Sequence, residues 1–242
     1  MEETSAPLTS SNKLATNSLL PNRLVANRLG TNSLTNAMLS APELLATPGG
    51  REVLTYVISC ALEPRAQLVL QDRGTRYTFE GGLGLAPAWR FHVPTQAERR
   101  WVTACVLART NLFGAAVPLS LRGANPALQP ALLEPAGYAL VEGAFYGDLF
   151  APDGPKLFAC DALVRDLDLG LSTQDLRACV MSDASGQDGA TTRCGFTYAG
   201  RCSVADLAPA PACTSLLPAH RGCRGGGDRY DEVITVYLQT RL

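Results

Sequence analysis

The sequence predicts an α+β protein, in which a short N-terminal β-solenoid-type coil precedes a disulfide-stabilised antiparallel-sheet domain with two main helices. Leucine recurs at every fifth residue near the N-terminus. Further along, two segments have helical spacing and several short ones have the alternation of strands. Six of the eight cysteines lie from residue 160 onwards, in a loop-rich region. We therefore divide the chain into a tail or tether at 1–11, a repeat segment at 12–46 and the α+β domain at 47–242.

The repeat segment has a period that suits neither regular element. On an α-helix, residues five apart differ by about 140° around the axis. On a flat strand they alternate between faces. A coil that turns one corner every five residues instead points each leucine, and the residue two before it, inward. The predicted inward positions are Leu14, Leu19, Leu24, Leu29, Leu34, Leu39 and Leu44, with Asn12, Asn17, Asn22, Asn27 and Asn32.

This pattern resembles the pentapeptide-repeat proteins, which wind a right-handed, four-sided β-solenoid, although that family usually has Ala or Ser where this chain has Asn. The resemblance implies a spacer or docking surface rather than chemistry. So few repeats need support, so we expect the segment to pack on the body or on a second copy of itself. A protein partner or homo-oligomer formed through the repeats is therefore expected. The alternative is an Asn/Leu-rich linker with no fixed structure.

Two helices and a hairpin are predicted in the first half of the body. The first helix begins at Thr47 and Pro48 and ends before Pro64. "QLVLQD" and "RYTFEG" follow as strands, with a tight turn at Arg73-Gly74.

The second helix begins at Thr95, which forms a capping box with Glu98, and Gly114 offers its end. Later strand-like runs are "VPLSLRG", "YALVEGAF", "KLFAC" and "EVITVYLQ", the last of which predicts a half-buried strand. "STQDLRACVM" predicts a short helix between them.

The even number of cysteines indicates disulfides formed in an oxidising compartment. Zinc is the alternative, but no C-x2-C pair is present, and His220-Arg-Gly-Cys223 is the nearest spacing. We expect Cys60 and Cys105, which both lie in the middle of a predicted helix, to pair with each other. The predicted disulfide set is Cys60, Cys105, Cys160, Cys179, Cys194, Cys202, Cys213 and Cys223.

Charge and hydropathy exclude two classes of partner. The net charge of −1 predicts no field for nucleic acid, and no apolar run is long enough to span a bilayer. The opening "MEETSAPLTSS" lacks the features of a signal peptide, so export requires that a leader was removed. The same stretch suits the tether that follows a lipid anchor.

Candidate catalytic groups are few. His92, between aromatic residues, is expected to be a packed structural residue, and His220 is expected to be exposed in a loop. Acidic side chains could instead form a glycosidase pair or a calcium site, although no calcium-loop motif is present. These are Asp161, Asp166, Asp168, Asp228, Asp231 and Glu232. We assign no catalytic or metal-binding residue and no cofactor, with calcium as the alternative.

The order of the segments in the body resembles cysteine-rich exported proteins of myxobacteria, on the stretches "WVTACVLARTNLFG…VPLSLRG", "EGAFYGDLF" and "EVITVYL". The resemblance implies export and Asn/Leu-rich N-terminal repeats. We therefore expect a non-catalytic structural or interaction protein that is extracellular, periplasmic or associated with the outer membrane. The alternatives are an extracellular hydrolase and a calcium- or carbohydrate-binding module.

Overall fold

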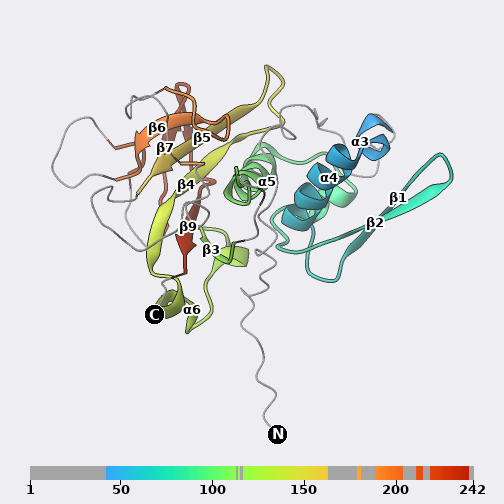
Figure 1. The fold of residues 1–242 in the computed structure, drawn as a ribbon, viewed down its shortest axis with the longest axis horizontal. Coiled ribbons are helices and arrows are strands. Elements are labelled where there is room, and N and C mark those ends of the chain that lie inside the picture. The colour runs from blue at the N-terminus through green and yellow to red at the C-terminus, as the bar shows by residue number, and fades with distance from the viewer. Residues whose placement is uncertain are drawn as a thin grey trace, which may run out of the picture.

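The computed structural model describes residues 42–112, 114, 117–162, 179–180, 189–203, 211–214 and 219–239. Its centre is a five-stranded sheet with the order β3-β9-β4-β5-β6 (Figure 1). The pairs β3–β9, β9–β4 and β4–β5 are antiparallel, whereas β6 runs parallel to β5. The strands are β3 (Leu119–Arg122), β4 (Leu140–Asp148), β5 (Lys156–Asp161), β6 (Thr197–Arg201) and β9 (Ile234–Leu238). The predicted antiparallel sheet is thus correct except at β6.

Two helices and a hairpin lie in succession beside this sheet. Helix α5 (Gln96–Ala108) contacts β4 and β9, and α4 (Pro48–Ala61) packs on α5. The hairpin formed by β1 (Gln67–Asp72) and β2 (Thr75–Glu80) packs on α4 and lies farthest from the sheet (Figure 1). The mixed α+β class is therefore confirmed, with two main helices between a large sheet and a small one.

Both helices begin where the sequence predicts. The Thr47 side chain accepts a hydrogen bond from the Gly50 N–H at 3.0 Å. At α5 the capping box is complete, since Thr95 Oγ1 accepts from the Glu98 N–H and the Glu98 carboxylate accepts from the Thr95 N–H. The end of α5 was predicted wrongly: the helix ends at Ala108, where the Arg109 N–H bonds to the Val106 carbonyl three residues back.

The sheet is buried on both faces, and alternate residues of a strand serve two apolar clusters. On β4, Phe145 joins the main core with the helices, while Ala144 and Tyr146 face a second cluster. That second cluster is covered by the cysteine-bearing loops and by the hairpin of β7 (Cys223–Gly225) and β8 (Asp228–Tyr230). For this reason every residue of β9 is buried, and the prediction of a half-buried strand was wrong.

The first described residues belong to the body rather than to a repeat coil. Residues Pro42–Ala46 form the short helix α3, and Leu44 and Leu45 lie in the main core. A Cβ on Gly50 would come within 2.3 Å of the Leu44 carbonyl oxygen, so the two segments touch through their backbones. Leu44 was predicted as the last repeat leucine, and the helix corrects that assignment. The other repeat positions, Leu14 to Leu39 and Asn12 to Asn32, lie outside the described residues.

The remaining elements are short. Of the helix predicted at 172–181, the structure describes only Cys179 and Val180, which lie in a turn. No helix in the described ranges is long and apolar enough to cross a membrane.

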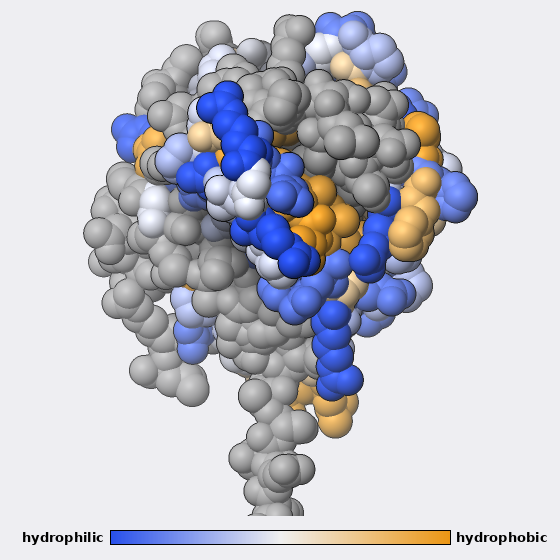
Figure 2. Space-filling model, turned by 90° about the vertical axis from the view of Figure 1, so that its right-hand side faces the viewer, coloured by the Kyte–Doolittle hydropathy of each residue, from blue (hydrophilic) through white to orange (hydrophobic). Residues whose placement is uncertain are grey.

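Figure 2 shows the face that carries α4 and the β1–β2 hairpin, where an apolar area lies between hydrophilic residues. The other short helices are η2 (Pro87–Arg90), η3 (Pro126–Leu128) and α6 (Glu134–Gly137).

Candidate functional site: two adjoining disulfides

All eight cysteines are joined in four disulfides, and none is free. Cys60 on α4 is bonded to Cys105 on α5, which is the pairing predicted from their positions. This bridge lies in the main core and ties together the two principal helices. The other three pairs are Cys160–Cys202, Cys179–Cys194 and Cys213–Cys223.

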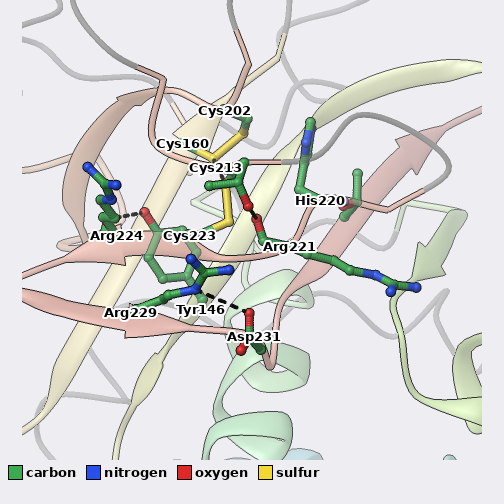
Figure 3. Close-up of a disulfide and its surroundings, with 12 residues drawn as sticks. Tyr146, Cys160, Cys202, Cys213, His220, Arg221, Cys223, Arg224, Arg229 and Asp231 are labelled. Carbon is green, nitrogen blue, oxygen red and sulfur yellow. Dashed lines mark hydrogen bonds and ion pairs between the residues drawn. A yellow bond between two sulfur atoms is a disulfide. The ribbon is translucent and has the colours of Figure 1, made fainter.

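Two of these disulfides adjoin each other (Figure 3). The Sγ atoms of Cys160 and Cys213, which belong to different bridges, lie 3.7 Å apart. With Cys202, their sulfur atoms all fall within 4.8 Å of one another. Cys160 comes from β5, Cys202 follows β6, and Cys223 begins β7. Segments that are distant in sequence thus deliver four sulfur atoms to one place, which we call the four-cysteine cluster: Cys160, Cys202, Cys213 and Cys223.

The four-cysteine cluster is enclosed by apolar groups. Its four cysteines are at most 2% exposed and form part of the second apolar cluster. Three aromatic rings lie in the same cluster: Tyr146 stacks on Phe158 at a centroid distance of 5.6 Å, and Tyr230 lies against both. The Tyr146 hydroxyl donates to the Arg224 carbonyl at 2.7 Å, which anchors β7 over the sheet. Water is therefore largely excluded from the sulfur atoms.

Two exposed arginines adjoin cysteines of the four-cysteine cluster in the chain. Arg201 immediately precedes Cys202 and Arg224 immediately follows Cys223, and both are exposed. Within the described residues neither has an ion-pair partner. Arg229, the cross-strand neighbour of Arg224, lies 3.6 Å from the Asp231 carboxylate. Arg224 and Arg229 are like charges at a cross-strand position, which is unfavourable, and Asp231 offsets the charge of Arg229.

The two histidines are placed differently from expectation. His220, predicted to be exposed, is only 2% exposed, because its loop packs beside β9 and its N–H donates to Thr235 Oγ1 at 2.8 Å. Figure 3 shows His220 on the loop beside the four-cysteine cluster. His92, predicted to be packed, is exposed in the turn before α5, and its side chain makes no hydrogen bond within the described residues. Both predictions were wrong because they rested on neighbouring residues, whereas the burial of a loop histidine depends on how its loop packs against distant strands.

Three of the candidate acidic residues form ion pairs with separate bases. Asp228 lies 3.4 Å from Lys156, and Glu232 lies 3.7 Å from Arg100. Together with the Asp231–Arg229 pair, these contacts show each of the three C-terminal acids beside a base. The hydrogen bond to Asp153, followed by that to Asp228, raises the pKa of Lys156 above its usual value.

The first acidic group is divided between described and undescribed parts of the chain. Asp161 is buried at the end of β5, and its carbonyl accepts from the Cys202 N–H. Asp166 and Asp168 lie outside the described residues. Of this first group, the structure therefore places Asp161 alone.

Sequence reasoning missed the meeting of Cys160 and Cys213, which no spacing indicates. It also missed Arg109, a buried cation between α4 and α5 whose guanidinium donates to Ser59 Oγ and lies over the Tyr56 ring. Burial lowers the pKa of Arg109 to about 10.

In comparisons with known proteins, the chain matches no protein-family model, no curated protein and no solved structure.

Proposed function

We propose that this is an exported, non-catalytic structural or interaction protein of the cell envelope or extracellular space. The observation that supports it is the use of all eight cysteines in four buried disulfides. Disulfides persist in oxidising compartments and are reduced in most cytosols. Disulfides stabilise the folded body in such a compartment by constraining the unfolded chain.

The proposed interaction role rests on two parts of the chain. The N-terminal repeats, with leucine at every fifth position, would associate with a partner protein or a second copy of the chain. The β1–β2 hairpin offers a further contact, because within the described residues each of its strands pairs only with the other. Val69 on the outward side of β1 is 45% exposed. An unpaired strand edge with apolar side chains favours association.

Thiol titration in denaturant tests the export part of the proposal. Protein produced with an added leader and collected from the periplasm should show fewer than one free thiol per chain. Cytosolic protein that has been fully reduced serves as the reference with eight. Eight free thiols in the periplasmic product would overturn the proposal.

Light scattering at several protein concentrations tests the association part. The full chain is expected to form an oligomer whose mass rises with concentration, and a chain that lacks residues 1–41 is expected to be a monomer. As a matched control, Leu24→Asp with Leu29→Asp keeps the length but removes two repeat leucines, and it should also be monomeric. If the shortened chain and the full chain have the same mass per particle, the repeats do not mediate association.

A further inference from the structure

We infer that the four-cysteine cluster is a redox-switched metal site, which holds two disulfides when oxidised and one Zn²⁺ ion when reduced. The inference concerns the cluster formed by Cys160, Cys202, Cys213 and Cys223, and it does not depend on the proposed role in the envelope. It follows from the placement of the sulfur atoms, the backbone that holds them and the charge around them.

Three of the four sulfur atoms, those of Cys160, Cys202 and Cys213, already lie within the span of a zinc thiolate site. Zinc binds four thiolates at about 2.3 Å in a tetrahedron, so its ligand sulfur atoms lie about 3.8 Å apart. The sulfur atoms of Cys160 and Cys213 already lie 3.7 Å apart, although no bond joins them. Cys202 places its sulfur within 4.8 Å of both. Reduction frees the side-chain torsions of the four cysteines, and Cys223, which is bonded to Cys213 in the oxidised state, then has to turn toward the other three to supply the fourth ligand.

Backbone hydrogen bonds, as well as the S–S bonds, join the segments that carry the four cysteines. The Cys202 N–H donates to the Asp161 carbonyl at 2.8 Å, and the Cys213 N–H donates to the Cys202 carbonyl at 3.0 Å. The Arg224 N–H, next to Cys223, donates to the Ala212 carbonyl at 2.8 Å. These bonds link the end of β5, the residue after β6, the loop at 211–214 and β7. These bonds do not involve sulfur, so we expect them to keep the four segments close after reduction.

Charge and burial also suit a metal thiolate. Four thiolates with one Zn²⁺ carry a net charge of −2, and the exposed Arg201 and Arg224, which adjoin Cys202 and Cys223 in the chain, supply two positive charges on the same segments. The enclosing Tyr146, Phe158 and Tyr230 rings exclude water, which would otherwise compete for the metal. Within the described residues, Cys160, Cys202 and Cys213 are the only group of three or more His, Cys, Asp or Glu side chains whose ligand atoms lie close enough to share an ion.

The switch requires a reductant, and a trialkylphosphine serves in the test. Each phosphine takes the oxygen atom of one water molecule and supplies two electrons, so that one disulfide becomes two thiols and the phosphine becomes its oxide. Two phosphines thus convert the cluster into four thiols. Binding of one Zn²⁺ to these thiols releases four protons.

Zinc content before and after reduction tests the inference on the full chain. Oxidised and phosphine-reduced protein are each incubated with Zn²⁺, desalted and analysed for zinc by mass spectrometry. We expect one zinc ion per reduced chain and none per oxidised chain. Co²⁺ in place of Zn²⁺ should give the absorption bands of a tetrahedral cobalt thiolate. A reduced chain that retains no zinc would overturn the inference.

Matched double variants locate the site. Cys213→Ser with Cys223→Ser removes two ligands and should abolish zinc retention after reduction. Cys179→Ser with Cys194→Ser removes a disulfide outside the cluster and should leave one zinc ion per chain. Retention by the first variant would place the metal elsewhere and contradict the inference.

Near-UV circular dichroism covers the case in which reduction unfolds the chain. Zinc is then expected to restore the native aromatic signal in the wild type and in the Cys179/Cys194 variant. It is not expected to do so in the Cys213/Cys223 variant. An unfolded reduced chain that zinc fails to refold would equally reject the metal site.

Discussion

The hydroxyl of Thr103 joins helix α5 to the end of strand β4. It donates to the Arg99 carbonyl at 2.7 Å and accepts from the Leu149 N–H at 2.9 Å. Thr103 is fully buried, and Leu149 is only 5% exposed. The same helix contacts the strand end through Arg99, whose guanidinium lies 3.3 Å from the Asp148 carboxylate. These side chains fix the position of α5 along the sheet.

Replacement of Thr103 by valine should lower the free energy of unfolding by on the order of 2 kcal/mol. Valine has the shape of threonine but leaves the buried Leu149 N–H without an acceptor. Thr103→Ser keeps the hydroxyl and should lose only the contribution of one methyl group, about 0.8 kcal/mol. Urea unfolding of both variants measures the difference. Equal losses would show that the hydroxyl does not stabilise this junction.

Strand pairing between β4 and β5 depends on close backbone contact at Gly147. Gly147 has a φ of +143°, and a Cβ there would lie 2.0 Å from the Lys156 carbonyl oxygen. Only glycine meets both the conformation and the spacing. This contact holds the start of β5 against the end of β4, and β5 in turn carries Cys160 to the four-cysteine cluster.

Gly147→Ala should destabilise the protein by more than about 3 kcal/mol, because backbone must move to admit the methyl group. Gly154→Ala is the matched control in the turn between the same strands. It has a φ of +117° but no atom within 4 Å of its Cβ position. That variant should show conformational strain alone, about 1–2 kcal/mol. A thermal or urea unfolding series decides, and a loss at Gly147 no larger than at Gly154 would contradict the close contact.

At the scale of the whole molecule, one disulfide joins the two main helices and the other three involve loops. Cys60–Cys105 closes a segment of 45 residues and joins the two main helices. In the chain-entropy model, a bridge over such a segment stabilises the folded state by about 4 kcal/mol. Cys60→Ala with Cys105→Ala should therefore lower the free energy of unfolding by about that amount, as measured by denaturant titration. A loss under about 1 kcal/mol would show that packing alone holds α4 on α5.

The folded protein should also lose stability above pH 10. Burial raises the pKa of Tyr138, Tyr230 and Tyr237 above the ordinary value of 10.0. Their neutral forms are favoured by folding, so this contribution is present below pH 10 and is lost as the pH rises through the raised pKa values. Arg109 acts in the opposite direction, since its pKa is lowered to about 10 and the penalty of burying its charge disappears above that pH.

Unfolding measured over the alkaline range tests this balance of three tyrosines against one arginine. The wild type is expected to lose stability as the pH rises above 10. Tyr138→Phe with Tyr230→Phe removes two of the three groups and should show a shallower decline. A wild type whose stability rises over this range would show that Arg109 dominates.

The correct sequence predictions depended on neighbouring residues. Thr95 and Glu98, three residues apart, determine the start of α5 because they cap each other's backbone. Cys60 and Cys105 were paired correctly because each lies in an apolar stretch of a helix, and such helices pack face to face. The predictions for His92, His220 and β9 were wrong about how deeply a residue is buried, whereas those for Leu44 and the end of α5 were wrong about where a helix lies. Burial is decided by segments far away in the chain.

Local periodicity, capping and composition were enough to predict the α+β class, the helix starts, most of the strands and the presence of disulfides. Three features became known from the folded chain alone: β6 runs parallel to β5, the sheet is covered on both faces, and Cys160 lies 3.7 Å from Cys213. These features depend on packing between segments separated by tens of residues, and the residues next to a side chain in sequence do not indicate which distant segment will cover it.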